Sequence, residues 1–256
     1  MSHQLQPDRV EIRDVWTWAV QAQALYRRKP VLFTVLSLVF FYFSYLLVMT
    51  SYLTFFAGLV LCQVMLVLVI ELARTVDESK PVSLSRCYTA LQNSIVATLM
   101  LACFYVLMWV IAAKIASMFF LESLLGDSLD VAPISFLQWL YPGTVGFFVV
   151  YIGLMVTTMW FLMPITVFNR LSFIESMKLA KQGERINFAV VVVASYVPFF
   201  AFFMLFIISE LALVVAIAGL PWFGIYLFVS YRHVYMGRKE NAPEVVKVVA
   251  AENQTA

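Results

Sequence analysis

The sequence predicts an all-α, polytopic membrane protein with six transmembrane helices and short amphipathic interfacial helices on the cytoplasmic side. The first reason is composition. Of the 256 residues 63% are hydrophobic and 12% are charged, whereas soluble chains are about half apolar and about a quarter charged. The second reason is that the apolar residues form runs as long as the ~20 residues that cross a hydrocarbon core. The third is that the basic residues gather in a few short segments between these runs.

Residues 1–30 are expected to form an N-terminal cytoplasmic amphipathic helix. Asp8 and Glu11 have the spacing of a capping box, and Pro30 stands where a new helix can begin. One helical face is expected to carry Ile12, Trp16, Ala19 and Tyr26, and Trp16 and Trp18 are expected to suit the membrane interface.

The next 40 residues, Val31 to Ile70, carry no charge. A single helix of that length would be about 60 Å long, twice the ~30 Å core, so we divide it at the polar stretch Met49–Tyr52. The six predicted spans are 31–49, 52–72, 93–113, 139–162, 187–208 and 211–231, within a bundle at 31–235 that is followed by a polar cytoplasmic tail at 236–256.

The basic residues orient these spans. Of the 17 Lys and Arg, only Lys114 lies outside the N-terminus, the connectors between spans two and three and spans four and five, and the C-terminus. Basic segments stay in the cytoplasm, so both termini are predicted to lie there.

The connector before span five, "LSFIESMKLAKQGERIN", is expected to form a surface helix of about ten residues. Ser172 and Glu175 form a capping box, Gly183 is the predicted helix stop, and Asn187 is the predicted cap of span five. Asn93 is the corresponding cap of span three. The expected apolar face of the surface helix carries Phe173, Ile174, Met177 and Ala180, and its polar face carries Glu175, Lys178, Gln182 and Arg185.

Four residues could line a cavity at the membrane midplane: Gln63, Tyr196, Pro198 and Pro221. An amide in hydrocarbon needs hydrogen-bond partners, so Gln63 either bonds a neighbouring helix or faces a solute. Pro198 and Pro221 are expected to break spans five and six, which in transporters creates substrate sites; simple kinks are the alternative.

The charged residues at the span ends are expected to reach water. Glu71, Lys114 and Glu210 lie near span ends and are predicted to snorkel. His3 and His233 lie near the termini and are predicted to face solvent.

The chemistry-bearing motifs that enzymes use do not occur. There is no HExxH, GxSxG, Gly-rich phosphate loop or CxxC. We therefore expect no catalytic residue, no cofactor, no metal and no enzymatic activity, and the scattered basic residues do not indicate nucleic acid.

The cytoplasmic basic residues are interpreted as orientation signals and as a docking or anionic-lipid surface. They are Arg27, Arg28, Lys29, Arg170, Lys178, Lys181 and Arg185.

Three segments, Tyr26–Phe33 ("YRRKPVLF"), Trp160–Val193 and Leu220–Tyr235, carry a family resemblance. The chain is similar to the YciC-like bacterial inner-membrane proteins of six spans, a family of unknown function. The positions that match this family are Pro164, Ser172, Ser176 and Asn187. The resemblance implies a bacterial inner-membrane location and a compact helical bundle.

Two functions are compatible with these features. The first is a non-enzymatic envelope accessory or interaction protein, with the lipid bilayer and another membrane or envelope protein as partners. The alternative is a small transporter or permease for an apolar or neutral solute.

Overall fold

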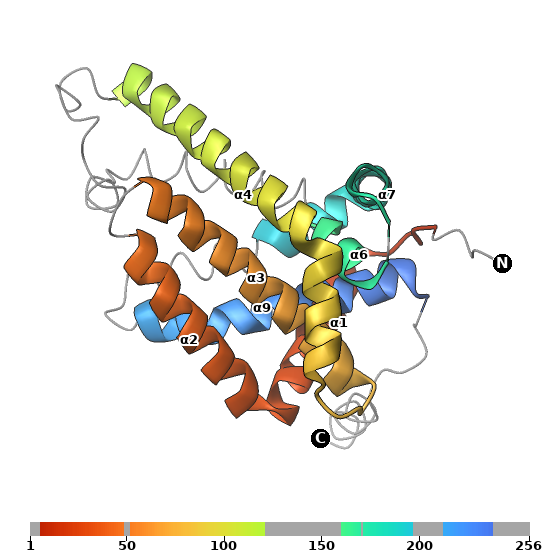
Figure 1. The fold of residues 1–256 in the computed structure, drawn as a ribbon. Helices are drawn as coiled ribbons and strands as arrows, with labels where there is room; N and C mark the ends of the chain where they lie inside the picture. Colours follow the sequence, from red (N-terminus) through yellow and green to blue (C-terminus); the bar gives the residue numbers. More distant parts are fainter. Residues whose placement is uncertain (1–5, 49–51, 121–159, 170, 197–211, 238–256) are drawn as a thin grey trace, which may run out of the picture.

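The computed structural model describes residues 6–48, 52–120, 160–169, 171–196 and 212–237 (Figure 1). Within these ranges all regular structure is helical, as the sequence predicts. The helices are α1 (Ile12–Arg28), α2 (Pro30–Val48), α3 (Tyr52–Asp77), α4 (Leu84–Phe120), α6 (Leu162–Phe168), α7 (Phe173–Ile186), a helix over 188–196, and α9 (Ala212–Tyr235).

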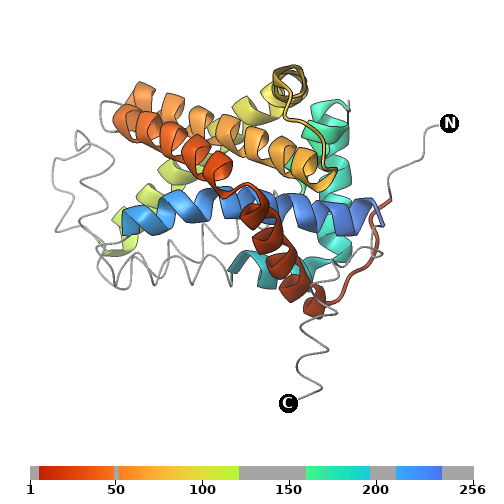
Figure 2. The same cartoon turned by 90° about the horizontal axis from the view of Figure 1, so that it is seen from below.

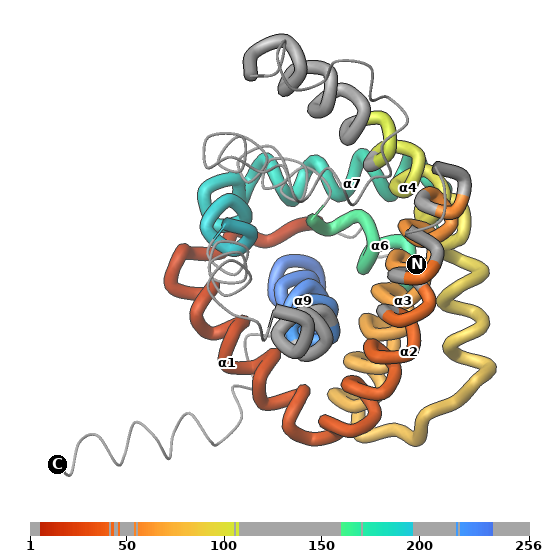
Figure 3. Tube along the Cα trace, turned by 90° about the vertical axis from the view of Figure 1, so that its left-hand side faces the viewer, coloured from red at the N-terminus to blue at the C-terminus, as the bar shows by residue number. Residues whose placement is uncertain are grey.

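The last helix, α9, forms the centre of the bundle. Viewed along its axis it is ringed by α1, α2, α3, α6 and α7 (Figure 3), and α1, α2, α3 and α6 contact it directly. Every residue from 224 to 235 is buried as a consequence. A helix that is apolar almost all round lies either in a protein core or in a membrane, and here the other helices cover its C-terminal half.

The α2–α3 hairpin and α4 form one side of the bundle, with α3 between its two neighbours (Figure 1). Two stretches of the described chain, Phe56–Asp77 and Leu84–Phe104, are long and apolar enough to cross a membrane. A shorter apolar stretch lies at Pro30–Phe40. The starts of α2 and α3 agree with the predicted spans one and two.

The start of α4 differs from the prediction. This helix begins at Leu84, where the carbonyl of Ser83 accepts from the N–H groups of Arg86 and Cys87, and it runs straight through Asn93. Asn93 is therefore not a cap. The chain that follows Pro81 contains no further proline or glycine before the apolar run, so nothing interrupts the helix between Leu84 and Asn93.

The surface helix α7 confirms one prediction and corrects two. Ser172 Oγ accepts from the Glu175 N–H at 3.3 Å, and the Glu175 carboxylate accepts from the Ser172 N–H at 3.0 Å, as expected for a capping box. The helix, however, has 14 residues and continues past Gly183. The helix buries Ser176, Ala180, Gly183 and Glu184. Of the predicted apolar face, Ala180 is buried and Phe173 and Met177 pack against the core, whereas Ile174 is 59% exposed.

Gly183 is required by a close approach and not by a helix stop. A Cβ at this position would lie 2.1 Å from Tyr235 Oη. The Tyr235 hydroxyl donates to the Leu179 carbonyl at 2.8 Å. Only glycine lets α7 lie this close to the end of α9.

Asn187 ends α7 and fastens the N-terminal segment. Its Oδ1 accepts from the Val10 N–H at 2.9 Å, and its Nδ2 donates to the Asp8 carbonyl at 2.9 Å. Asn187 Nδ2 also donates to the Gly183 carbonyl at 3.2 Å. The predicted side-chain cap of span five is wrong, because this side chain bonds α7 and the N-terminal segment, and only the Asn187 carbonyl accepts from the next helix, from the Val191 N–H. The Asp8 N–H donates to Val234 O at 2.7 Å.

The first helix, α1, crosses over α9 (Figure 2). Its capping box is Glu11 with Asp14, three residues later than predicted, because the helix begins only at Ile12 and Asp8 lies in the non-helical segment before it. Trp16 is 75% exposed, whereas Trp18 is 0% exposed and packs against Tyr226. The two tryptophans therefore lie on opposite faces, and only Trp16 can meet a membrane interface.

Candidate functional site

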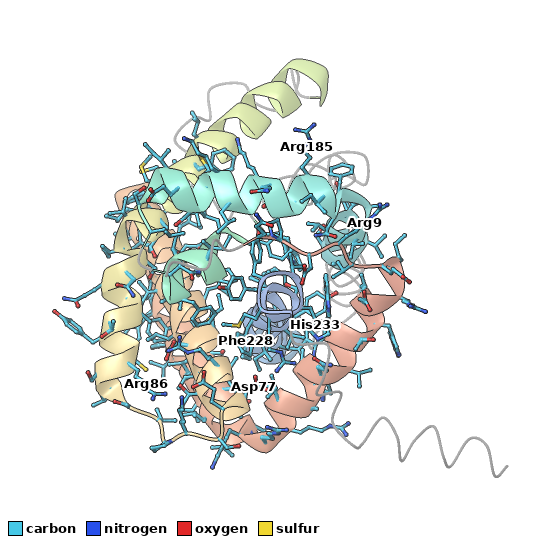
Figure 4. All side chains as sticks on the ribbon, turned by 90° about the vertical axis from the view of Figure 1, so that its right-hand side faces the viewer. Arg9, Asp77, Arg86, Arg185, Phe228 and His233 are labelled. Atoms are coloured by element: carbon cyan, nitrogen blue, oxygen red, sulfur yellow. The ribbon has the colours of Figure 1, made fainter. Side chains whose placement is uncertain are left out.

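Polar side chains from α1, α3 and α9 meet where α1 crosses the C-terminal half of α9. Arg232 on α9 donates through Nη1 to Asp77 Oδ1 on α3 and through Nη2 to Gln21 Oε1 on α1, both at 2.6 Å. Figure 4 shows Asp77, Phe228 and His233 at this end of α9. We call Gln21, Asp77, Arg232 and His233 the polar junction. It joins helices that are separated by 155 to 212 positions in the sequence.

The junction is largely removed from water. Gln21 is 5% exposed and Arg232 is 8% exposed. The Arg232 guanidinium also lies 5.8 Å from the centre of the Phe228 ring, a cation–π contact. A charge buried to this degree is tolerated only when it is paired and hydrogen-bonded, so Asp77 and Gln21 are needed wherever Arg232 is buried.

The hydrogen bonds also show that Nε2 of the His233 ring carries a proton. Gln21 must present its oxygen to the guanidinium of Arg232, because an amide NH₂ cannot accept from an arginine N–H. The same oxygen lies 3.1 Å from His233 Nε2, so Nε2 is the donor and carries a proton. The His233 ring packs edge-on against Trp18 with 6.2 Å between the ring centres.

His233 was predicted to face solvent, and this prediction is wrong. The residue is 7% exposed, because α1 folds back over the end of α9. A signal does exist in the sequence. Gln21 lies among the buried Trp18, Ala22 and Leu25 on α1, and a polar residue on an otherwise apolar face indicates a buried partner.

The second polar pair, Glu71 with Arg74, lies one to two turns before Asp77 on α3. Arg74 Nη2 donates to Glu71 Oε1 at 2.9 Å, and the Arg74 guanidinium lies 4.8 Å from the centre of the Phe168 ring. Glu71 is 1% exposed. The predicted snorkelling of Glu71 is therefore wrong, because the short helix α6 covers this part of α3.

The third buried group, Glu184 on α7, was missed by sequence reasoning. It is 8% exposed, and Oε1 has no hydrogen-bond partner among the described residues. Burial raises the pKa of the Glu184 carboxyl to about 8, although the backbone N–H groups of Phe161 and Trp160 donate to it and oppose the shift. The only hint in the sequence is the spacing from Ala180 and Ser176, which puts Glu184 on the same helical face as these two small residues.

Two of the four predicted midplane residues, Gln63 on α3 and Pro221 on α9, lie on helices that contact each other. On α3 and α9, Val69 and Leu66 lie against the position of Gly224, one turn from Gln63 and Pro221. The predicted break at Pro221 is absent, because α9 passes through this residue as one helix. Tyr196 ends the described part of the helix over 188–196, and Pro198 lies outside the described residues.

Gln63 is the candidate with an unmet hydrogen bond. Its Oε1 is buried and has no partner among the described residues. A buried acceptor without a donor costs about 1–3 kcal/mol. Gln63 therefore stays a candidate for contact with a polar group that the described part of the chain does not supply.

The predicted basic surface consists of two separate parts. One is at the end of α1, where Arg27, Arg28 and Lys29 are exposed, and the other is on α7, where Lys178, Lys181 and Arg185 are exposed. Arg170, Glu210 and His3 lie outside the described residues, and Lys114 lies in a part of α4 whose side chains are not described. Among the described residues no group of three His, Cys, Asp or Glu is arranged to hold a metal ion.

No family model, no curated protein and no solved structure matches this chain.

Proposed function

We propose that the chain is an inner-membrane protein of bacteria with six spans and cytoplasmic termini, and that it acts without catalysis as an accessory protein through contacts with lipids and other membrane proteins. One observation carries the topology. Four segments that the basic residues assign to the cytoplasm all meet the same end of α9.

These four contacts are specific. The N-terminal segment bonds Val234 through the Asp8 N–H. The connector after α3 begins at Asp77, the partner of Arg232. The surface helix α7 bonds Tyr235, and the C-terminal segment follows directly from that residue. A wrong topology would separate these segments to opposite sides of the bilayer.

The direction of α3 and α9 adds independent support. Val69 lies against Gly224, and eight residues further along both helices, at 77 and 232, Asp77 pairs with Arg232. The two helices are therefore parallel. Spans two and six of a six-span chain both run from outside to inside, which is the relation that parallel packing requires.

The accessory role is supported by closure of the cytoplasmic end. A transporter that works by alternating access opens a water path from the midplane to that side in its inward-facing state. Here the central helix is buried from 224 to 235, and the polar groups of the junction bond one another. This arrangement favours a fixed, closed bundle that displays its surface to partners.

Affinity purification of the chain in its native lipids, after cross-linking in intact cells, tests the accessory role. We expect a defined membrane protein to co-purify in constant proportion with the wild type. A matched variant, Lys178→Gln with Lys181→Gln, changes the exposed face of α7 and should reduce this recovery if α7 docks the partner. Recovery of the chain without any stoichiometric protein or lipid would contradict the role.

The transporter is kept as a second candidate because the buried Gln63 oxygen has no hydrogen-bond partner within the described part of the chain. Its test is uptake of a panel of labelled neutral solutes into proteoliposomes that contain the purified protein. Uptake by the wild type that is abolished by Gln63→Ala, and kept by Gln92→Ala on the exposed part of α4, would replace the accessory proposal. Gln92 is exposed, so it serves as a matched control.

A further inference from the structure

A groove of about 430 Å³ lies between the N-terminal segment and the junction of α7 with the helix over 188–196. Its base is apolar, with Val10, Ile12, Ile186 and Val190 among the lining residues. Ile12 is 54% exposed and Ile186 is 41% exposed. The volume suits a small head group and the first methylenes of its chains, and it is too small for a whole lipid.

Guanidinium groups mark one rim of the groove. Arg9 and Arg13 line it together with Glu11, and Arg13 Nε bonds Glu11 Oε2 at 2.8 Å. The opposite charges of Arg13 and Glu11 cancel, so Arg9 gives the rim a net charge of one positive unit. Figure 4 shows Arg9 on the N-terminal segment, on the same side of the molecule as Arg185 at the end of α7.

We propose that this groove binds the head group of one anionic phospholipid of the inner leaflet, with Arg9 on the phosphate. The apolar base receives the glycerol end of the acyl chains. One phosphodiester matches the single net charge of the rim, and a guanidinium is the side chain best suited to a phosphate. The site is separate from Arg27, Arg28 and Lys29 at the other end of α1.

The place of the groove in the proposed topology fits this ligand. Asn187, which also lines the groove, stands where the chain passes from the cytoplasmic helix α7 into the predicted fifth span. The groove therefore lies at the depth of the phosphate layer of the inner leaflet. A lipid here would contact both the N-terminal segment and the start of span five, which Asn187 already joins. This location rests on the proposed function.

Native mass spectrometry of the full-length protein in a neutral detergent tests the site. The probes are phosphatidylglycerol, phosphatidylcholine and inorganic phosphate. We expect one tightly bound phosphatidylglycerol, weaker phosphatidylcholine binding and no retention of inorganic phosphate. Arg9→Ala with Arg13→Ala should weaken phosphatidylglycerol binding by roughly tenfold, whereas Arg27→Ala with Arg28→Ala should leave it unchanged.

A second variant tests the apolar base. Ala189 lines the groove and is exposed, so Ala189→Trp should fill it and prevent lipid binding without disturbing the core. Ser85→Trp, at an exposed position on α4, is the matched control.

Three results would overturn the proposal: equal affinity for the two lipids, equal loss in the two double-arginine variants, or full binding by Ala189→Trp. Extraction of the chain from membranes by alkaline carbonate would contradict the proposed function instead, and the lipid measurement in detergent does not depend on that result.

Discussion

Two polar stretches of this chain look alike in sequence and behave differently in the fold. The helix α7 lies between two long apolar runs, and the Arg232–His233 pair of α9 follows one. On α7 Lys178, Lys181 and Arg185 are exposed, whereas Arg232 and His233 are 8% and 7% exposed. The difference is that α1, more than 200 positions away in sequence, covers the end of α9. Exposure of a polar stretch thus depends on its tertiary cover and not on its composition.

The largest expected effect is the difference in stability loss when an arginine is removed from α9 and when one is removed from α7. Arg232→Ala leaves the Asp77 carboxylate without its partner in a site that is mostly buried. Removing one partner of such a pair costs about 3–5 kcal/mol, so the apparent melting temperature in detergent should fall sharply. Arg185→Ala on α7 is the control and should cost no more than about 0.5 kcal/mol.

A double variant sharpens that comparison. Asp77→Asn with Arg232→Gln removes both charges and should recover a large part of the lost stability, because no uncompensated charge remains. If the double variant is less stable than Arg232→Ala alone, the ion pair is not the source of the effect.

The second prediction concerns the pH dependence of stability and rests on Glu184. Its pKa is raised from 4.5 to about 8 in the folded chain, so the group stabilises the fold fully below about pH 4.5. This contribution is lost as the pH rises towards 8, by at most about 1.4 kcal/mol per pH unit. Glu184→Gln keeps the shape of the side chain and removes the charge. The melting temperature of this variant should therefore depend less on pH between pH 5.5 and 7.5.

Glu175→Gln is the matched control for that measurement. This carboxyl is exposed, and bonds from Ser172 lower its pKa. The slope between pH 5.5 and 7.5 should therefore be the same as in the wild type. A Glu184→Gln variant with an unchanged slope would show that Glu184 is not a neutral acid in the folded chain.

The third prediction tests the close approach of α7 and α9. Gly183→Ala places a methyl group on the Tyr235 hydroxyl and should destabilise the fold by about 1–3 kcal/mol through overpacking. A helix stop would predict the opposite, because alanine favours a helix over glycine. Differential scanning fluorimetry decides between them, with Gln182→Ala on the exposed face as the control.

The smallest expected effect distinguishes the two tryptophans of α1. Trp16→Phe should change stability by less than about 0.5 kcal/mol, since Trp16 is 75% exposed. When Trp16 is kept, brominated lipids in vesicles should quench the fluorescence of Trp16 and should not quench the fluorescence of Trp18. Quenching of Trp18, measured in a variant that has phenylalanine at the other tryptophan positions, would contradict the packing of α1 on α9.

Local signals predicted the elements, and long-range contacts decided the site. The capping box of Ser172 and Glu175 needs only four neighbouring residues, and it forms as expected. A glycine at position 183 is typical of a helix stop, yet the need for glycine there comes from the close approach of Tyr235, 52 positions away. The burial of His233 is set by Gln21, at a separation of 212 positions. The position of Gln21 on the apolar face of α1 indicates a buried partner, but no pattern within a single helix identifies that partner.

The proposed cytoplasmic position of the closed end of α9 is tested most directly by cysteine accessibility. In a background with Cys62, Cys87 and Cys103 replaced by alanine, Lys178→Cys and Ser230→Cys report on two positions at the same end of the bundle, one exposed and one 0% exposed. A membrane-impermeant maleimide should label Lys178→Cys in inside-out vesicles and not in intact cells. Ser230→Cys should stay unlabelled in both until the protein is denatured. Labelling of Lys178→Cys from outside the cell, or rapid labelling of Ser230→Cys in native vesicles, would contradict a closed cytoplasmic end.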